Sequence, residues 1–147
     1  MDILAAIKAR RACRAFLDKS LDKKLVELIL KSALHAPSNK NTQPWHIAIV
    51  TGKAKAQLGE ALIKLDQSGE PVKPDFSHID NSMGEPYWDR ARACGAALYE
   101  ALSIERDDHD RRQAQWQSNY KFFDAPVGLV FYIKKNFSQS SLFDMGI

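Results

Sequence analysis

The sequence contains little cysteine and no long apolar run. Its two cysteines, Cys13 and Cys94, are too few for a disulfide framework and too far apart for a clustered metal site. No apolar stretch approaches the roughly 20 residues that a helix needs to cross a bilayer. The chain starts Met1-Asp2-Ile3-Leu4, without the basic start and apolar core of a signal peptide. We therefore expect neither a disulfide-rich secreted domain nor a membrane protein, and we expect a cytoplasmic location.

Composition and length are those of one ordinary globular domain. Apolar residues make up 45% and charged residues 27% of the chain, close to globular averages. A length of 147 residues predicts a single domain over 1–147. No internal repeat or low-complexity tract is present, so repeat architectures are not expected.

Positive charge is concentrated near the start of the chain. Residues 1–60 hold 11 Lys and Arg against 5 Asp and Glu, a net of +6, and residues 61–147 hold 10 against 13, a net of −3. Three arginines lie within five positions: Arg10, Arg11 and Arg14. Alone, such a cluster is typical of a solvated helix face. It lacks interleaved aromatic residues and the remaining chain is acidic, so we expect no nucleic-acid partner.

Hydrophobic periodicity predicts helices that alternate with two strands. Helices are expected over 2–10, from Ser20 or Asp22 to about His35, over 53–66, over 88–104, onward to Phe122, and from Leu142. The β-branched stretches 45–51 and 127–133 are the expected strands. Residues 67–87 contain three prolines and two glycines, so we interpret them as a long loop.

Two strands alone cannot support an α/β domain. Residues 142–147 resemble the first turn of a helix with no stop signal after it. Either the chain borrows strands from a partner, or it stops before its remaining elements. We favour the second explanation.

The arginine cluster and the loop from Pro37 to Gln43 suit one kind of ligand. Guanidinium groups bind phosphate through two hydrogen bonds and stay charged at any working pH. The loop, with the sequence PSNKNTQ, offers short amides and hydroxyls that suit the edge of a heteroaromatic ring. A phosphorylated, flat cofactor would use both features.

Three segments, in order, resemble signatures of the nitroreductase family of flavin enzymes. They are 10–16 (RRACRAF), 36–45 (APSNKNTQPW) and 119–128 (NYKFFDAPVG). The second is the most specific, and together the three span most of the chain. The resemblance implies an α+β (three-layer α/β) fold with a central, mainly antiparallel sheet flanked by helices, here incomplete.

The resemblance also implies a function. Family members are FMN-dependent oxidoreductases that use NADH or NADPH, and they are homodimers with the flavins at the subunit interface. Hydride passes through flavin N5 to nitroaromatics, quinones or similar small acceptors in a ping-pong cycle, and loop 67–87 is expected to govern acceptor choice. The flavin carries the chemistry, so we assign no catalytic residue. The four histidines show no metal spacing, so we assign no metal.

Site residues follow from the same resemblance. Arg10 would contact the FMN phosphate or ribityl chain, with Arg11 and Ala12 lining that stretch. Arg14 would lie near the pyrimidine end of the isoalloxazine. Lys121, with Ser118 or Asn119 beside it on the same helix end, would reach the N1/O2 edge, where a fixed cation stabilises the reduced flavin.

The remaining contacts in the family come from a second subunit. Pro37, Ser38 and Asn39 would approach the flavin bound mainly by the other subunit. Ala12 stands where the family often has serine, so one hydrogen bond is expected to be missing. Family members are longer, and their second half supplies further phosphate ligands. The alternative function is therefore a truncated, non-catalytic fragment or interaction module that cannot hold FMN tightly.

Several other residues receive ordinary interpretations. We expect Cys13 to be a small buried residue and Cys94 to be a packing residue in an alanine-rich helix. Trp45 is expected in the core rather than against a flavin. Trp88 follows the long loop together with Tyr87, and a position facing the substrate is the less favoured alternative to an ordinary structural one.

Overall fold

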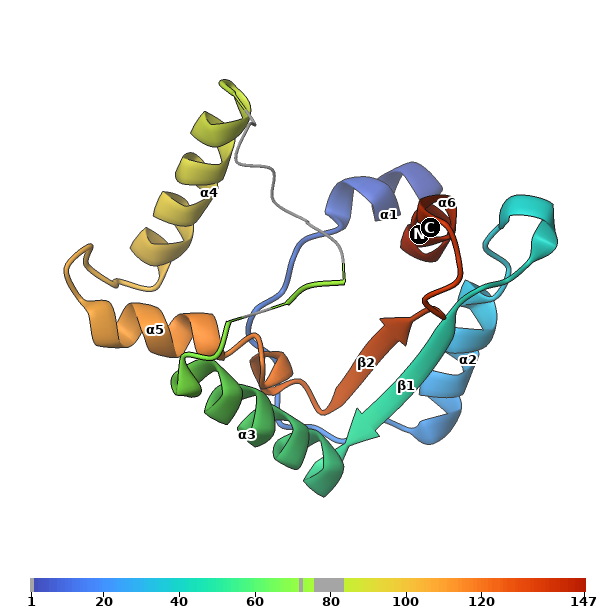
Figure 1. Cartoon of the computed structure of the whole chain (residues 1–147), viewed down its shortest axis with the longest axis horizontal. Coiled ribbons are helices and arrows are strands. Elements are labelled where there is room, and N and C mark those ends of the chain that lie inside the picture. The colour runs from blue at the N-terminus through green and yellow to red at the C-terminus, as the bar shows by residue number, and fades with distance from the viewer. Residues whose placement is uncertain (1, 72, 76–83) are drawn as a thin grey trace. The chain divides into compact units, whose positions relative to one another are not determined.

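The structure, a computed structural model, describes residues 2–71, 73–75 and 84–147. Contacts within the chain group into two units, residues 1–60 with 121–147, and residues 61–120. The helices and strands are α1 (Ile3–Ala9), α2 (Lys23–Ala33), η1 (Asn39–Asn41), β1 (His46–Thr51), α3 (Gly52–Ser68), α4 (Tyr87–Ala101), α5 (His109–Gln117), η2 (Phe122–Asp124), β2 (Val127–Tyr132) and α6 (Gln139–Gly146) (Figure 1). The prediction of one domain over 1–147 stays a prediction.

The first unit is built on an antiparallel pair of strands. β1 and β2 pair from His46 opposite Tyr132 to Thr51 opposite Val127. The side chains of His46 and Tyr132 stack across the pair with ring centroids 5.2 Å apart. Both predicted strands are confirmed, since β-branched and aromatic residues fit a pleated surface. The adjoining Gly52 begins α3 with φ +48°.

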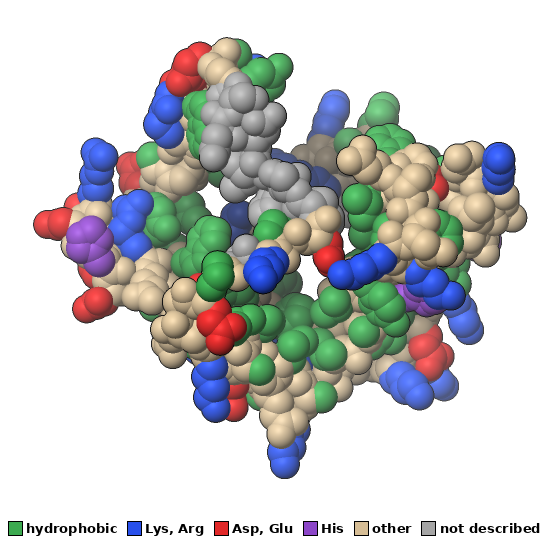
Figure 2. Space-filling view, in the orientation of Figure 1, with side chains coloured by type: hydrophobic (Ala, Val, Ile, Leu, Met, Phe, Trp, Pro, Cys, Tyr) green, Lys and Arg blue, Asp and Glu red, His purple; other side chains and the backbone are tan. Residues whose placement is uncertain are grey.

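Helix α2 confirms its predicted type and start. The Asp22 side chain accepts a hydrogen bond from the Lys24 N–H at 2.9 Å and so caps the first turn. Several apolar side chains of α2 are only partly covered by the described chain, because Leu25, Leu28 and Ile29 are 46%, 61% and 53% exposed. Hydrophobic side chains are accordingly visible at the surface in Figure 2.

The second unit contains α4, α5 and the end of α3. The Arg112 guanidinium lies 3.8 Å from the centroid of the Tyr99 ring, which joins α5 to α4. Asp66 of α3 accepts hydrogen bonds from the Gln117 amide at 3.0 Å and the Tyr120 hydroxyl at 3.2 Å. Ile104, between α4 and α5, is the buried apolar side chain of this unit among the described residues.

Several expectations need correction or lie partly outside the described residues. Cys13 and Cys94 are both exposed, so the predicted burial of each is wrong. The predicted helix toward Phe122 ends at Gln117, and η2 takes its place. The loop predicted over 67–87 is bounded by Ser68 in α3 and Tyr87 in α4, and residues 72 and 76–83 lie outside the described residues.

The described residues contain neither a membrane-spanning helix nor a metal-binding cluster. No helix in the described ranges is long and apolar enough to cross a membrane. Within residues 2–71, 73–75 and 84–147, no cluster of three His, Cys, Asp or Glu side chains is suited to hold a metal ion.

Candidate functional site

A basic corner, defined by Arg14, Lys55 and Lys121, forms around η2. The Arg14 guanidinium lies 5.9 Å from the centroid of the Phe123 ring. The Lys55 ammonium of α3 donates to the Lys121 carbonyl at 3.4 Å. Lys55 and Lys121 also line one small hollow of about 160 Å³ with Asp124. The chain thus brings two of the predicted flavin contacts, Arg14 and Lys121, to one short segment.

The backbone of η2 is unusual for residues other than glycine. Phe122, Phe123 and Asp124 have φ values of +57°, +51° and +59°. Such left-handed residues cost about 1–3 kcal/mol each, persist only when the surrounding structure holds them, and cluster at functional sites. Gly128 of β2 provides part of that support, because the Phe122 ring occupies the space where a side chain at 128 would lie.

The arginines of the cluster differ in the contacts that their side chains make. The Arg11 guanidinium donates to the Lys8 carbonyl at 2.7 Å and to the Arg10 carbonyl at 2.9 Å, so it caps the C-terminus of α1. Arg10 makes no side-chain hydrogen bond or ion pair within the described residues and is exposed, as is Ala12. Its guanidinium is therefore available for an anion.

The predicted loop from Pro37 to Gln43 is held at two points. The Ser38 hydroxyl oxygen accepts the Gln43 N–H at 2.9 Å, which leaves the hydroxyl hydrogen to donate elsewhere. The Asn39 N–H donates to the Asp144 carboxylate of α6 at 3.2 Å. The exposed Pro37 precedes both bonds. This loop also contains left-handed residues, at Lys40, Asn41 and Gln43.

The loop and the basic corner lie at opposite ends of the strand pair. The loop leads into β1 at His46, whereas η2 leads into β2 at Val127, which pairs with Thr51 (Figure 1). The five residue steps of β1 separate the two ends by about 17 Å, at roughly 3.4 Å per residue. The structure therefore brings Arg14 and Lys121 to one end and Pro37, Ser38 and Asn39 to the other.

Asn119, the remaining predicted contact, belongs to the second unit. Its side-chain amide donates to the Trp116 carbonyl at 2.7 Å, one turn back. Trp45, expected in the core, is half-buried, and the preceding Pro44 is buried.

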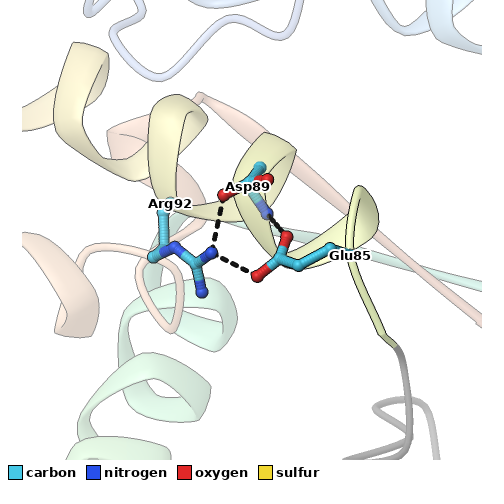
Figure 3. A network of polar contacts seen from close by, with 3 residues as sticks. All are labelled: Glu85, Asp89 and Arg92. Carbon is cyan, nitrogen blue, oxygen red and sulfur yellow. Dashed lines mark hydrogen bonds and ion pairs between the residues drawn. The ribbon is translucent and has the colours of Figure 1, made fainter.

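The clearest cluster of charged side chains in the second unit consists of residues that were not predicted as site residues. Arg92 donates to Glu85 and Asp89 at the start of α4 (Figure 3). The carboxylate of Glu85 and, secondly, that of Asp89 raise the pKa of Arg92 above its ordinary value. All three side chains are more than half exposed, so the network contributes little to stability.

Comparison with known proteins identifies the family. The model of the nitroreductase family matches residues 7–146. The chain belongs to the nitroreductase family. This agrees with the resemblance found in the sequence and confirms it.

Two curated nitroreductases show how far the likeness extends. Nitrobenzene nitroreductase of Ectopseudomonas oleovorans is 34% identical over 95% of this chain and 62% of its own length. 4-Nitrobenzoate reductase of Pseudomonas putida is 36% identical over 99% of this chain and 63% of its own length. The chain thus spans about three fifths of the length of these curated nitroreductases.

Solved nitroreductases show the same fold. The FMN and NADPH-dependent nitroreductase NfnB of Sphigopyxis sp. strain HMH superposes with a TM-score of 0.93, at 33% identity over 99% of this chain and 66% of that one. The FMN-dependent NfnB of Mycobacterium smegmatis, solved with NADPH, gives 0.89 at 34% identity over 99% and 67%. The predicted α+β fold with an antiparallel sheet is confirmed.

Two residues of the candidate site could not be predicted from the sequence. Lys55 looks like any solvated lysine on a helix, and Asp144 looks like a polar residue in a C-terminal turn. Their partners, Lys121 and Asn39, are 66 and 105 positions away. No local pattern signals either contact.

Proposed function

We propose that this protein binds FMN and is an NADH- or NADPH-dependent oxidoreductase. The observation that carries the proposal is the basic corner, where Arg14, Lys55 and Lys121 surround a backbone held in left-handed conformations. When bound, FMN would supply the redox chemistry, which is hydride transfer from the nicotinamide through N5 to an acceptor in a ping-pong cycle, and the residues of this chain would hold and orient it. The relatives named for nitrobenzene and 4-nitrobenzoate support nitroaromatics as the acceptor class, with quinones as a second.

The donor chemistry of the corner fits a flavin. Reduction places negative charge at the pyrimidine edge of the ring system, and fixed cations stabilise that charge when they are preorganised. In this proposal Arg14 and Lys121 supply the cations, while Arg10, whose guanidinium has no partner in the described chain, binds the phosphate. Arg11 and Ala12 line the stretch beside it, and Asn119 lies near Lys121.

We also propose that the active form is a homodimer. The loop with Pro37, Ser38 and Asn39 lies a strand length of about 17 Å from the basic corner of the same chain. That separation exceeds the length of a flavin ring system. The loop of one chain therefore serves the flavin that a second copy holds. The exposed apolar side chains of α1 and α2, such as Ile7 and Leu28, at 67% and 61%, give such a partner surface to cover.

Flavin titration tests the proposal. The purified full chain is mixed with FMN, and the visible spectrum, the thermal midpoint and the dissociation constant are measured. We expect a yellow complex and a thermal shift. A chain that stays colourless, with no FMN-induced shift, would contradict the proposal.

Charge variants then test the placement of the flavin. Arg10→Ala is expected to weaken FMN binding ten- to hundredfold with little change in potential, since a charged hydrogen bond typically contributes about 1.5–3 kcal/mol. Arg14→Ala and Lys121→Ala are expected to lower the reduction potential or the affinity. Lys53→Ala, an exposed lysine of α3, is the control and should change neither. The placement is wrong if Arg10→Ala moves the potential while the other two variants move nothing.

A further inference from the structure

One carboxylate of this chain is buried where no catalytic role requires it. Asp144 of α6 is only 7% exposed. Among the described residues, its carboxylate accepts a hydrogen bond from the backbone N–H of Asn39, at 3.2 Å. Burying a charged side chain is unfavourable unless hydrogen bonds compensate it. The side chain is therefore positioned to hold a loop that lies 105 residues earlier in the chain.

The loop that it holds does not keep its shape through local preference. Lys40, Asn41 and Gln43 have φ values of +52°, +55° and +46°, and none is a glycine. Within the loop, the Asn41 N–H donates to the Ser38 carbonyl and the Gln43 N–H to the Ser38 hydroxyl oxygen, each at 2.9 Å. These bonds close the loop on itself. Within the described residues, the hydrogen bond to Asp144 attaches the loop to another element, in agreement with the packing of α6 on η1.

We propose that Asp144 is a positioning residue that fixes the shape of the Pro37–Asn39 segment presented to the flavin. The inference rests on the proposed function, in which this segment meets the flavin held by a second copy. Asp144 occupies the backbone N–H of Asn39, so that donor is not offered to a ligand. What remains available is the Ser38 hydroxyl hydrogen and the Asn39 side-chain amide.

The test combines hydrogen exchange with flavin affinity in the full chain. Asp144→Ala removes the acceptor, whereas Asp144→Asn keeps an acceptor oxygen in the same place. Ser141→Ala is the matched control, because Ser141 is also buried in α6, at 6% exposure. Amide exchange is followed at Asn41, Thr42 and Gln43, whose N–H groups all bond within the loop.

Asp144→Ala is expected to speed loop exchange at least about tenfold and to weaken FMN binding at least about fivefold. Asp144→Asn and Ser141→Ala should stay within about threefold of the wild type in both measurements. Unchanged exchange in Asp144→Ala would overturn the inference, as would an equal effect of Ser141→Ala. Faster exchange with unchanged FMN affinity would also overturn it, by leaving Asp144 a purely structural role.

The same bond can be removed from its other side if Asp144→Ala does not fold. Asn39→Pro lacks the donating N–H, and the extended Ser38 before it, with φ −143° and ψ 156°, accommodates a following proline. Asn39→Ala keeps the N–H and isolates the loss of the side chain. Exchange at Asn41 to Gln43 should rise in Asn39→Pro alone. If wild-type protein binds no FMN, the proposed function fails, while the exchange data still decide whether Asp144 holds the loop.

Discussion

At Gly128, adding one methyl group by substitution with alanine should markedly lower the stability of the fold. This residue is buried in β2, between the Phe122 ring and β1. A Cβ added there would lie 2.8 Å from two carbon atoms of the Phe122 ring and 2.9 Å from a methyl carbon of Val50. Both neighbours are constrained, since Val50 belongs to a paired strand and Phe122 to the left-handed η2. At least one of them would have to shift to admit the added carbon atom.

The expected size of the effect follows from two opposed contributions. Overpacking of this kind typically destabilises by about 1–3 kcal/mol. Replacing glycine with alanine also reduces the freedom of the unfolded chain, which stabilises by about 0.4–1 kcal/mol. We therefore expect Gly128→Ala to lower the free energy of unfolding by about 1–2 kcal/mol. Displacing Phe122 should also disturb the neighbouring Lys121 and weaken FMN binding.

Urea unfolding measures this loss, with a control in α4. At Gly95 an added Cβ meets nothing within 4 Å, so Gly95→Ala should stabilise by about 0.5–1 kcal/mol through helix propensity. In a double-mutant cycle, Phe122→Ala should remove much of the penalty of Gly128→Ala, with a coupling of about 0.5–3 kcal/mol. The reasoning is refuted if Gly128→Ala is as stable as the wild type, or if the two substitutions are additive.

Two further predictions concern local contacts. Asp22→Ala should lower the free energy of unfolding by about 1 kcal/mol, because it removes the cap on the Lys24 N–H. Asp22→Asn should retain most of the capping stabilisation. Equal losses of stability for the two variants in a urea titration would show that the charge of Asp22, rather than its capping bond, matters. Lys55→Met should weaken FMN binding severalfold while changing stability little, because the bond to the Lys121 carbonyl is long and exposed. Lys53→Met is its control in flavin titration, and equal effects of the two variants would exclude a specific role for Lys55.

Local sequence features predicted most of the secondary structure. The cap at Asp22 and the apolar spacing of α2 depend on contacts within one or two turns, and the β-branched stretches around Val50 and Val130 favour strands in any context. The family could also be recognised from short segments of the sequence, because residues that bind a cofactor often occur together in short stretches. The roles of those residues toward FMN stay predictions.

Burial and helix ends were harder to predict. Cys13 and Cys94 were expected inside and are exposed, because burial depends on what other elements cover a residue. The helix expected toward Phe122 stops at Gln117, and three residues of η2 adopt left-handed conformations that their side chains disfavour. Contacts with distant residues such as Gly128 of β2 help to hold such a backbone, and no local propensity indicates it.

The sequence by itself determined the family and the chemical character of the candidate site, since arginines and a polar, proline-bounded loop keep their chemistry wherever they lie. The tertiary structure alone decided which of these residues meet. Lys55 reaches Lys121 across 66 positions and Asp144 reaches Asn39 across 105. The antiparallel register then sets the loop and the basic corner at opposite ends of the strand pair. Contacts between distant residues depend on how the whole chain folds, and local preferences carry no information about them.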